Sequence, residues 1–92
     1  MTRILILEDS KECLEAITVM VERVSGHVCA VPVNSLEEAR AALGGEAQPP
    51  FQAFLLYINL NTGDSDDISG TTFAREVRMS KEYAFTPIIM IT

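Results

Sequence analysis

The 92-residue chain lacks tryptophan, contains a single histidine, and has only seven basic side chains, which are scattered along the sequence. Its net charge of −6 argues against nucleic-acid binding, because contacts with phosphates require clusters of lysine and arginine. No run of about 18 apolar residues is present, so no segment is predicted to span a membrane. Arg3, Glu8 and Asp9 interrupt the apolar residues near the start, which argues against a secretory signal peptide.

Cysteine is also scarce. The two cysteines, Cys13 and Cys29, lie on different predicted elements and have no CxxC spacing. We therefore expect both to be reduced thiols in a cytoplasmic protein, and a Cys13–Cys29 disulfide is the less favoured alternative. Hydrophobic residues make up 48% and charged residues 22% of the chain, which is typical of a folded globular protein. At this length we expect one small domain.

The apolar residues that are present fall into short runs. They predict β-strands at residues 3–7, 28–33, 53–58 and 87–92. Continuous runs of this length are typical of strands that are buried on both faces of a parallel sheet. Pro32 has no N–H group to donate to a neighbouring strand, so the second strand is predicted to lie at an edge of the sheet.

Between these runs the apolar residues recur at spacings of three and four, which is typical of amphipathic helices. The helices are predicted at residues 10–24, 36–43 and 71–79. The apolar face of the first consists of Leu14, Ile17, Val21 and Val24. Asp9 or Ser10 can cap its start, and Ser35 and Glu38 have the spacing of a capping box at the second. Alternating strands and helices predict a parallel sheet with right-handed crossovers and helices on both faces.

Ligands of open parallel sheets bind beyond the carboxyl ends of the strands. The first strand runs into Glu8 and Asp9, and the third ends near Tyr57. If these strands are neighbours, the three side chains converge on one small pocket. Two adjacent carboxylates suit Mg²⁺, which prefers oxygen ligands. The simpler alternative is that Glu8 and Asp9 only lead into the first helix and cap it.

Four segments, in the order RILILEDS, LLYINLN, DISGTTFAREVR and TPIIMIT, resemble the receiver domains of two-component response regulators. The resemblance covers essentially the whole chain and is closest to receivers joined to LytTR-type DNA-binding domains. It implies a flavodoxin-like, three-layer α/β/α fold with strand order 2-1-3-4-5. It also implies an acidic Mg²⁺ pocket and an aspartate that is phosphorylated by a histidine kinase.

The resemblance assigns a role to five positions. Glu8 and Asp9 match the acidic pair that binds Mg²⁺, and Asn59 matches the residue whose backbone carbonyl helps to hold the metal. Thr92 matches the hydroxyl residue that contacts the acyl phosphate and shifts on activation. Tyr57 falls on the phosphoacceptor position, because LLYINLN stands where the family typically has LLDINLP.

A tyrosine at this position changes the chemistry that is expected. Its phenol has a pKa of about 10 and is mostly uncharged at neutral pH, and its ring carries the oxygen beyond the place of a carboxylate. We therefore expect impaired phosphorylation and weak or absent Mg²⁺ binding, together with a raised pKa for Glu8 or Asp9. The loop acids Asp64, Asp66 and Asp67 could accept phosphate instead, but they are expected to lie away from the metal site.

The resemblance also bears on partners and on the end of the chain. The family's domain continues with two more helices and a lysine-bearing fifth strand, so residues 1–92 are expected to be an incomplete receiver, truncated after the fourth strand. That strand would present an apolar edge, which invites pairing. The expected partners are a histidine kinase or another receiver, a second copy of the chain, and an attached or separate effector domain, for example a DNA-binding one.

A different class of protein can use the same strand-end crevice. The alternative is a flavodoxin-like enzyme or cofactor-binding domain, since fold alone does not fix function. The loop after the first strand lacks the hydroxyl- and glycine-rich phosphate cradle that a flavin mononucleotide site needs. We therefore favour a signalling module that is not an enzyme.

Overall fold

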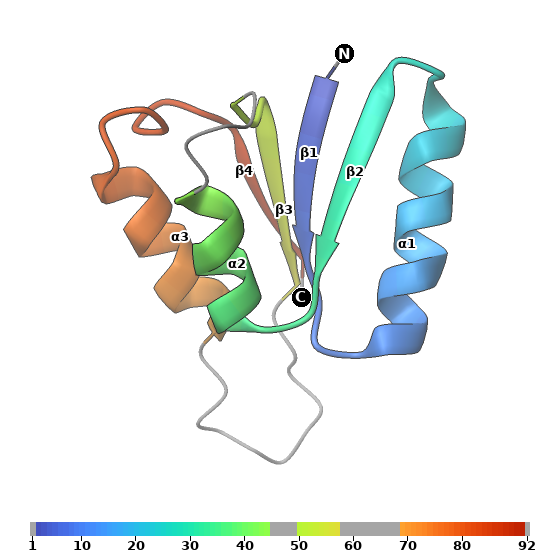
Figure 1. Cartoon of the computed structure of the whole chain (residues 1–92), viewed down its shortest axis with the longest axis horizontal. Helices are drawn as coiled ribbons and strands as arrows, with labels where there is room; N and C mark the ends of the chain where they lie inside the picture. The colour runs from blue at the N-terminus through green and yellow to red at the C-terminus, as the bar shows by residue number, and fades with distance from the viewer. Residues whose placement is uncertain (1, 45–49, 58–68, 92) are drawn as a thin grey trace.

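The structure is a computed structural model that describes residues 2–44, 50–57 and 69–91. Strands and helices alternate along these residues (Figure 1). The strands are β1 (Thr2–Leu7), β2 (Val28–Val33), β3 (Ala53–Tyr57) and β4 (Ile88–Ile91), and the helices are α1 (Lys11–Val24), α2 (Leu36–Leu43) and α3 (Ser69–Met79). Each predicted strand and helix is confirmed, with boundaries that differ by no more than two residues where they are described.

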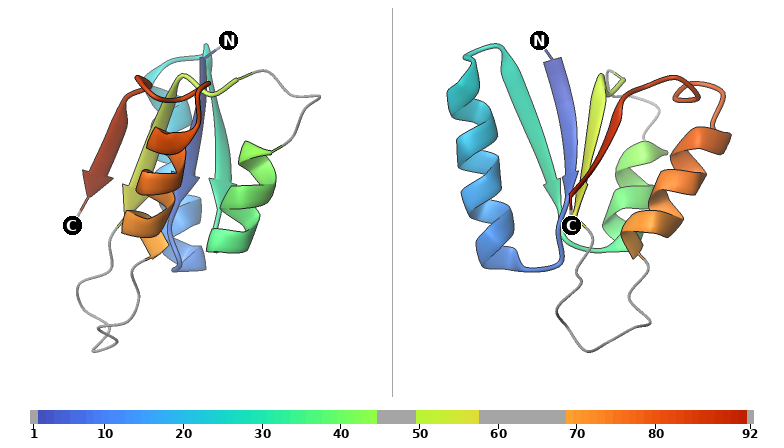
Figure 2. Two further views of the ribbon diagram at one scale, coloured as in Figure 1. Left: turned by 90° about the vertical axis from the view of Figure 1, so that its left-hand side faces the viewer. Right: turned by 180° about the vertical axis from the view of Figure 1, so that it is seen from behind.

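The strands form one parallel sheet with the order β2-β1-β3-β4. Helix α1 lies against β1 and β2 on one face, and α2 and α3 lie side by side on the other (Figures 1 and 2). This arrangement confirms the three-layer fold and the strand order that the resemblance implied. It also confirms that the strand containing Pro32 lies at an edge.

Serine side chains fix the starts of the first two helices. Ser10 Oγ accepts the Cys13 N–H at 3.4 Å, and Ser35 Oγ accepts the Glu38 N–H at 3.1 Å. These bonds satisfy backbone donors that have no partner inside the helix. The Glu38 carboxylate accepts the Asn34 N–H at 2.8 Å, one residue before the donor that a standard capping box uses.

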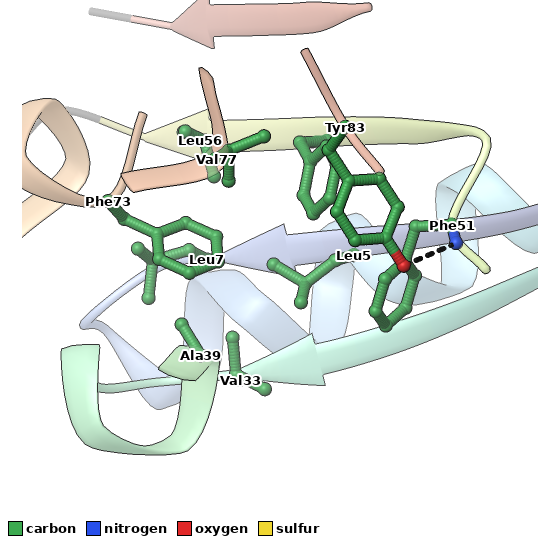
Figure 3. Close-up of a cluster of buried hydrophobic side chains, with 10 residues drawn as sticks. Leu5, Leu7, Val33, Ala39, Phe51, Leu56, Phe73, Val77 and Tyr83 are labelled. Carbon is green, nitrogen blue, oxygen red and sulfur yellow. Dashed lines mark hydrogen bonds between the residues drawn. The ribbon is translucent and has the colours of Figure 1, made fainter. Parts of the chain in front are cut away.

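The main core lies between the sheet and the α2–α3 layer (Figure 3). Its buried members are Leu5, Leu7, Val33, Ala39, Phe51, Phe54, Leu56, Phe73, Val77 and Tyr83. The rings of Phe54 and Tyr83 meet edge to face, with centroids 5.1 Å apart. The Tyr83 hydroxyl accepts the Phe51 N–H at 3.2 Å, which ties the connection between α3 and β4 to the start of β3.

Burial along the predicted apolar face of α1 is uneven. Leu14 is buried, but Val24, in the last turn, is 83% exposed. The reason is that α1 packs on β1 and β2, whereas β3 and β4 have no helix over this face among the described residues. The helix period identifies the side of α1 that faces the sheet, but it does not show which strands the helix covers.

Candidate functional site

The carboxyl ends of β1 and β3 lie side by side at the lower end of the sheet in Figure 1. Leu7 pairs with Leu56, so Glu8 and Tyr57 occupy the next positions on neighbouring strands. Paired strands lie about 4.8 Å apart, and residues beyond a paired position are therefore close. The structure thus brings residue 57 next to the first strand's acidic end, as the strand-end argument predicted.

Tyr57 points toward the α1 side of the sheet. Successive side chains of a strand alternate between faces, and the preceding residue, Leu56, belongs to the core on the α2–α3 side. Burial is the main factor that raises the pKa of the Tyr57 phenol above its ordinary value, and electrostatic interactions with Glu8 and with the Cys13 side chain add to the shift. The phenol therefore stays protonated at neutral pH.

Glu8 is held by two hydrogen bonds to the backbone. Its backbone N–H extends the β1 pairing by donating to Val33 O at 3.2 Å, and one carboxylate oxygen accepts the Ser10 N–H at 3.0 Å. The pKa of Glu8 is raised, first by burial and then by a side-chain hydrogen bond with Asp9 and the repulsion between the two carboxylates. The Ser10 bond opposes this shift but does not cancel it. The expectation of a raised pKa in the acidic pair is confirmed for Glu8.

Cys13 belongs to this site, although the sequence analysis considered it only as a marker of redox environment. It is exposed in the first turn of α1, and its electrostatic interaction with Tyr57 contributes to the raised pKa of the phenol. The sequence could have indicated this, because Cys13 follows the N-cap residue Ser10 by three positions. A side chain at that position lies in the first turn of the helix, close to the end of β1. Cys13 and Cys29 are both free, so the less favoured disulfide is absent.

Glu8 and Asp9 supply the oxygen donors that Mg²⁺ prefers, but the third position of the pocket holds a neutral phenol. Within residues 2–44, 50–57 and 69–91, no group of three or more histidine, cysteine, aspartate or glutamate side chains is placed to hold a metal ion. Glu8 and Asp9 could contribute oxygen ligands to a magnesium ion here. Asn59 and Thr92, as well as Asp64, Asp66 and Asp67, lie outside the described residues, so their roles stay predictions.

The arrangement provides no carboxylate nucleophile at the end of β3. A protonated phenol attacks phosphorus poorly, and the raised pKa of Tyr57 makes its ionised form rarer still. The described part of the site can hold a proton between Glu8 and Asp9 and can fill the pocket with an aromatic ring.

Comparison with solved structures gives three with closely similar folds. A sensor protein from Polaromonas sp. JS666 has a TM-score of 0.71 at 27% identity, and its match covers 97% of this chain and 63% of that one. Chemotaxis protein CheY4 from Vibrio cholerae has a TM-score of 0.76 at 22% identity, covering 98% and 67%. The N-terminal domain of a response regulator receiver protein from Methanoculleus marisnigri JR1 has a TM-score of 0.73 at 26% identity, covering 98% and 65%.

The fold is that of a CheY-like receiver domain. The chain spans about two thirds of the length of these structures. Comparisons with protein-family models and with curated proteins find no match. Among the described helices of this receiver fold, none is both long enough and apolar enough to cross a membrane.

Proposed function

We propose that the chain is a receiver module of a two-component or phosphorelay system that has lost the usual aspartyl phosphorylation. The observation that carries this proposal is the position of Tyr57 at the carboxyl end of β3, beside Glu8. The receiver fold supports the signalling role, since the structures it resembles include a chemotaxis protein and a response regulator receiver. Among the described residues of the pocket, Tyr57 is the one that departs from the chemistry that phosphorylation needs.

The pocket of a working receiver must combine a carboxylate nucleophile with a cation that neutralises the phosphoryl oxygens. Here the nucleophile is replaced by a phenol with a raised pKa, and one of the three negative charges that would attract Mg²⁺ is lost. Glu8 and Asp9, with the backbone carbonyl of Asn59, would hold the ion, and Mg²⁺ would supply charge neutralisation. We expect this binding to be weak. Glu8 and Asp9 share a hydrogen bond, and the proton in that bond must be lost before both carboxylates can bind Mg²⁺.

The module acts, in this proposal, through protein contacts and not as an enzyme. Its partners are a histidine kinase or another receiver, and an effector domain of the LytTR DNA-binding type or another kind. Phosphorylation normally biases a two-state element in such domains, with Thr92 as the expected switch residue. Without the phosphate, the bias must come from a binding partner, and a cytoplasmic location follows from these partners.

The test is to restore the acid. Tyr57→Asp, Tyr57→Asn and the unchanged chain are incubated with acetyl phosphate and Mg²⁺, and the phosphorylated fraction is measured by intact-mass spectrometry. Asparagine matches aspartate in size but has no charge, so it isolates the effect of the carboxylate. We expect label on the aspartate variant only. Equal labelling of the unchanged chain would overturn the proposal.

Magnesium affinity provides a second measurement on the same three proteins. A third carboxylate should strengthen Mg²⁺ binding, so in calorimetric titrations the Tyr57→Asp variant should bind at least about tenfold more tightly than the Tyr57→Asn variant, a difference of about 1.4 kcal/mol. If aspartate at this position adds neither phosphate nor Mg²⁺ affinity, residue 57 does not stand at a phosphoacceptor position and the proposal is wrong.

A further inference from the structure

A groove with a volume of about 630 Å³ lies between α1 and β2 and reaches the start of α2. Its floor is mainly apolar and is formed by Leu14, Thr18, Val19 and Pro32. Val19 is 49% exposed, although its side chain is entirely apolar. Apolar surface that is gathered in one depression is a mark of an interaction site, whereas single exposed apolar residues are common.

The position of this α1–β2 groove is set by the strand order. β2 is the strand farthest from β4, and Figure 1 shows α1 and β2 together at one side of the molecule. The fifth strand that the resemblance to receivers implies would add beside β4, on the opposite side of the sheet. The exposure of the α1–β2 groove therefore does not depend on which strand follows β4.

The backbone of β2 does not offer a partner a place to pair as a strand. Each outward N–H of the strand and of the residue after it has an acceptor within the chain, and Pro32, at the remaining outward position, has none to donate. The bonds are Val28 N–H to Ser25 O at 3.3 Å, Ala30 N–H to Glu22 Oε2 at 3.3 Å, and Asn34 N–H to Glu38 Oε2 at 2.8 Å. A ligand of the groove must therefore bind through side chains.

An amphipathic helix binds in this way, by laying its apolar side chains into a groove. The part of α1 that lines the groove, residues 11–19, is about 12 Å long, which is about two turns of helix. A helix that lies along it can place apolar side chains at positions i, i+3 or i+4, and i+7 against the floor.

The charge around the groove is negative. Glu15 and Glu38 line it, and Lys11 is the one basic residue among the described residues that do so. Residues 8–38, which include these side chains, contain seven acidic and two basic residues, so they carry a net charge of −5 out of −6 for the whole chain. A second copy of this acidic chain would be repelled, whereas a basic partner is attracted.

We propose that the α1–β2 groove is a docking site for a basic amphipathic helix of a partner protein. Apolar side chains of that helix fill the space above Val19 and Pro32, and its lysine or arginine side chains lie beside Glu15 and Glu38. The inference rests on the proposed function in one respect, which is that the module acts through protein contacts. Glu8, Asp9 and Tyr57 do not line the groove, so docking leaves the phosphoacceptor position uncovered.

The probe is a synthetic helical peptide of about four turns that has leucines at spacings of three and four and lysines at its other positions. Its matched control carries glutamate in place of each lysine. Binding is followed by the amide NMR signals of the chain. We expect the lysine peptide to shift the signals of Leu14 and Thr18 and to leave that of Val77, on the far side of the sheet, unchanged. The glutamate peptide should shift none of them.

Two variants separate the groove from general attraction between opposite charges. Glu15→Lys and Glu12→Lys alter exposed residues of the same helix and change the net charge equally, but only Glu15 lines the groove. We expect at least fivefold weaker binding of the lysine peptide for Glu15→Lys and less than a twofold change for Glu12→Lys. Equal weakening by the two variants would overturn the inference.

Val19→Glu tests the apolar floor. This variant adds a negative charge, so attraction by charge alone would strengthen binding of the lysine peptide. Docking in the groove predicts at least threefold weaker binding, because an apolar contact is lost. Stronger binding, no binding of the lysine peptide to the unchanged chain, or the same signal shifts on concentrating the chain alone would each overturn the inference. The labelling of residue 57 is measured without the peptide, so this inference and the proposed function fail separately.

Discussion

The hydroxyl of Tyr83 gives the sharpest test of how the fold is held together. Tyr83 is 4% exposed, and its hydroxyl oxygen accepts the N–H of Phe51, which is also 4% exposed. Tyr83→Phe removes this acceptor and leaves the ring in contact with Phe54. The variant therefore isolates one hydrogen bond in the core without creating a large cavity.

The expected cost follows from the burial of the donor. A buried N–H that loses its partner costs about 1–3 kcal/mol, and the bond length of 3.2 Å places this one in the lower half of that range. For a domain of this size, about 1–2 kcal/mol lowers the melting temperature by roughly 5–15 °C. The loss of stability comes from the buried Phe51 N–H, which would have no acceptor. The bond also joins the connection after α3 to the start of β3, two segments that are distant in sequence.

Thermal unfolding followed by circular dichroism at one protein concentration measures this cost. The chain has only one other tyrosine, and Tyr57→Phe is the matched control. Tyr57 is half-buried, and no described residue hydrogen-bonds to its hydroxyl, so that variant should change stability by less than about 0.5 kcal/mol. Equal melting temperatures for the two variants would refute the argument from burial.

Two further predictions concern charged side chains. Because the folded state raises the pKa of Glu8, the protonated form of Glu8 favours folding. This contribution to stability is fully present below the ordinary pKa of glutamate, and it is lost as the pH rises through the pKa of Glu8 in the folded state. Glu8→Gln should therefore stabilise the chain at pH 7 by less than about 1 kcal/mol after solvent screening, and urea unfolding at pH 3.5 should show no difference. Arg78 Nη1 donates to the carbonyls of Tyr83, Ala84 and Thr86, so Arg78→Ala should cost about 1–3 kcal/mol in the same assay, whereas Arg75→Ala on the same helix should cost little.

Most of the fold could be predicted because its signals are local. Apolar runs identified the strands, the change of period identified the helices, and Pro32 identified an edge. The order of the strands in the sheet could not be predicted in this way, because periodicity does not say which strands pair. That order came from the resemblance to receiver domains, and the structure agrees with it.

The parts that sequence reasoning missed depend on contacts between distant segments. Val24 fits the helix period and lines a groove with Ile4 and Val28, yet it stays exposed, because no described helix covers β3 and β4 on that face. Tyr83 sits in an irregular turn with no pattern, yet it enters the core because the chain folds back onto Phe51. For the candidate site, the meeting of Glu8 with Tyr57 could be inferred from strand ends, whereas the contribution of Cys13 required the position of α1.

The outward N–H groups of Ala30 and Asn34 on β2 are bound by glutamate side chains, and this limits how the sheet can be extended on that side. A sheet with two open edges can add copies at both ends and grow into a filament. Glu22, Glu38 and Pro32 remove that option at one end, since the outward donors there are either satisfied or absent. A strand from another molecule therefore finds few free N–H groups along β2, and polymerisation through this edge is disfavoured.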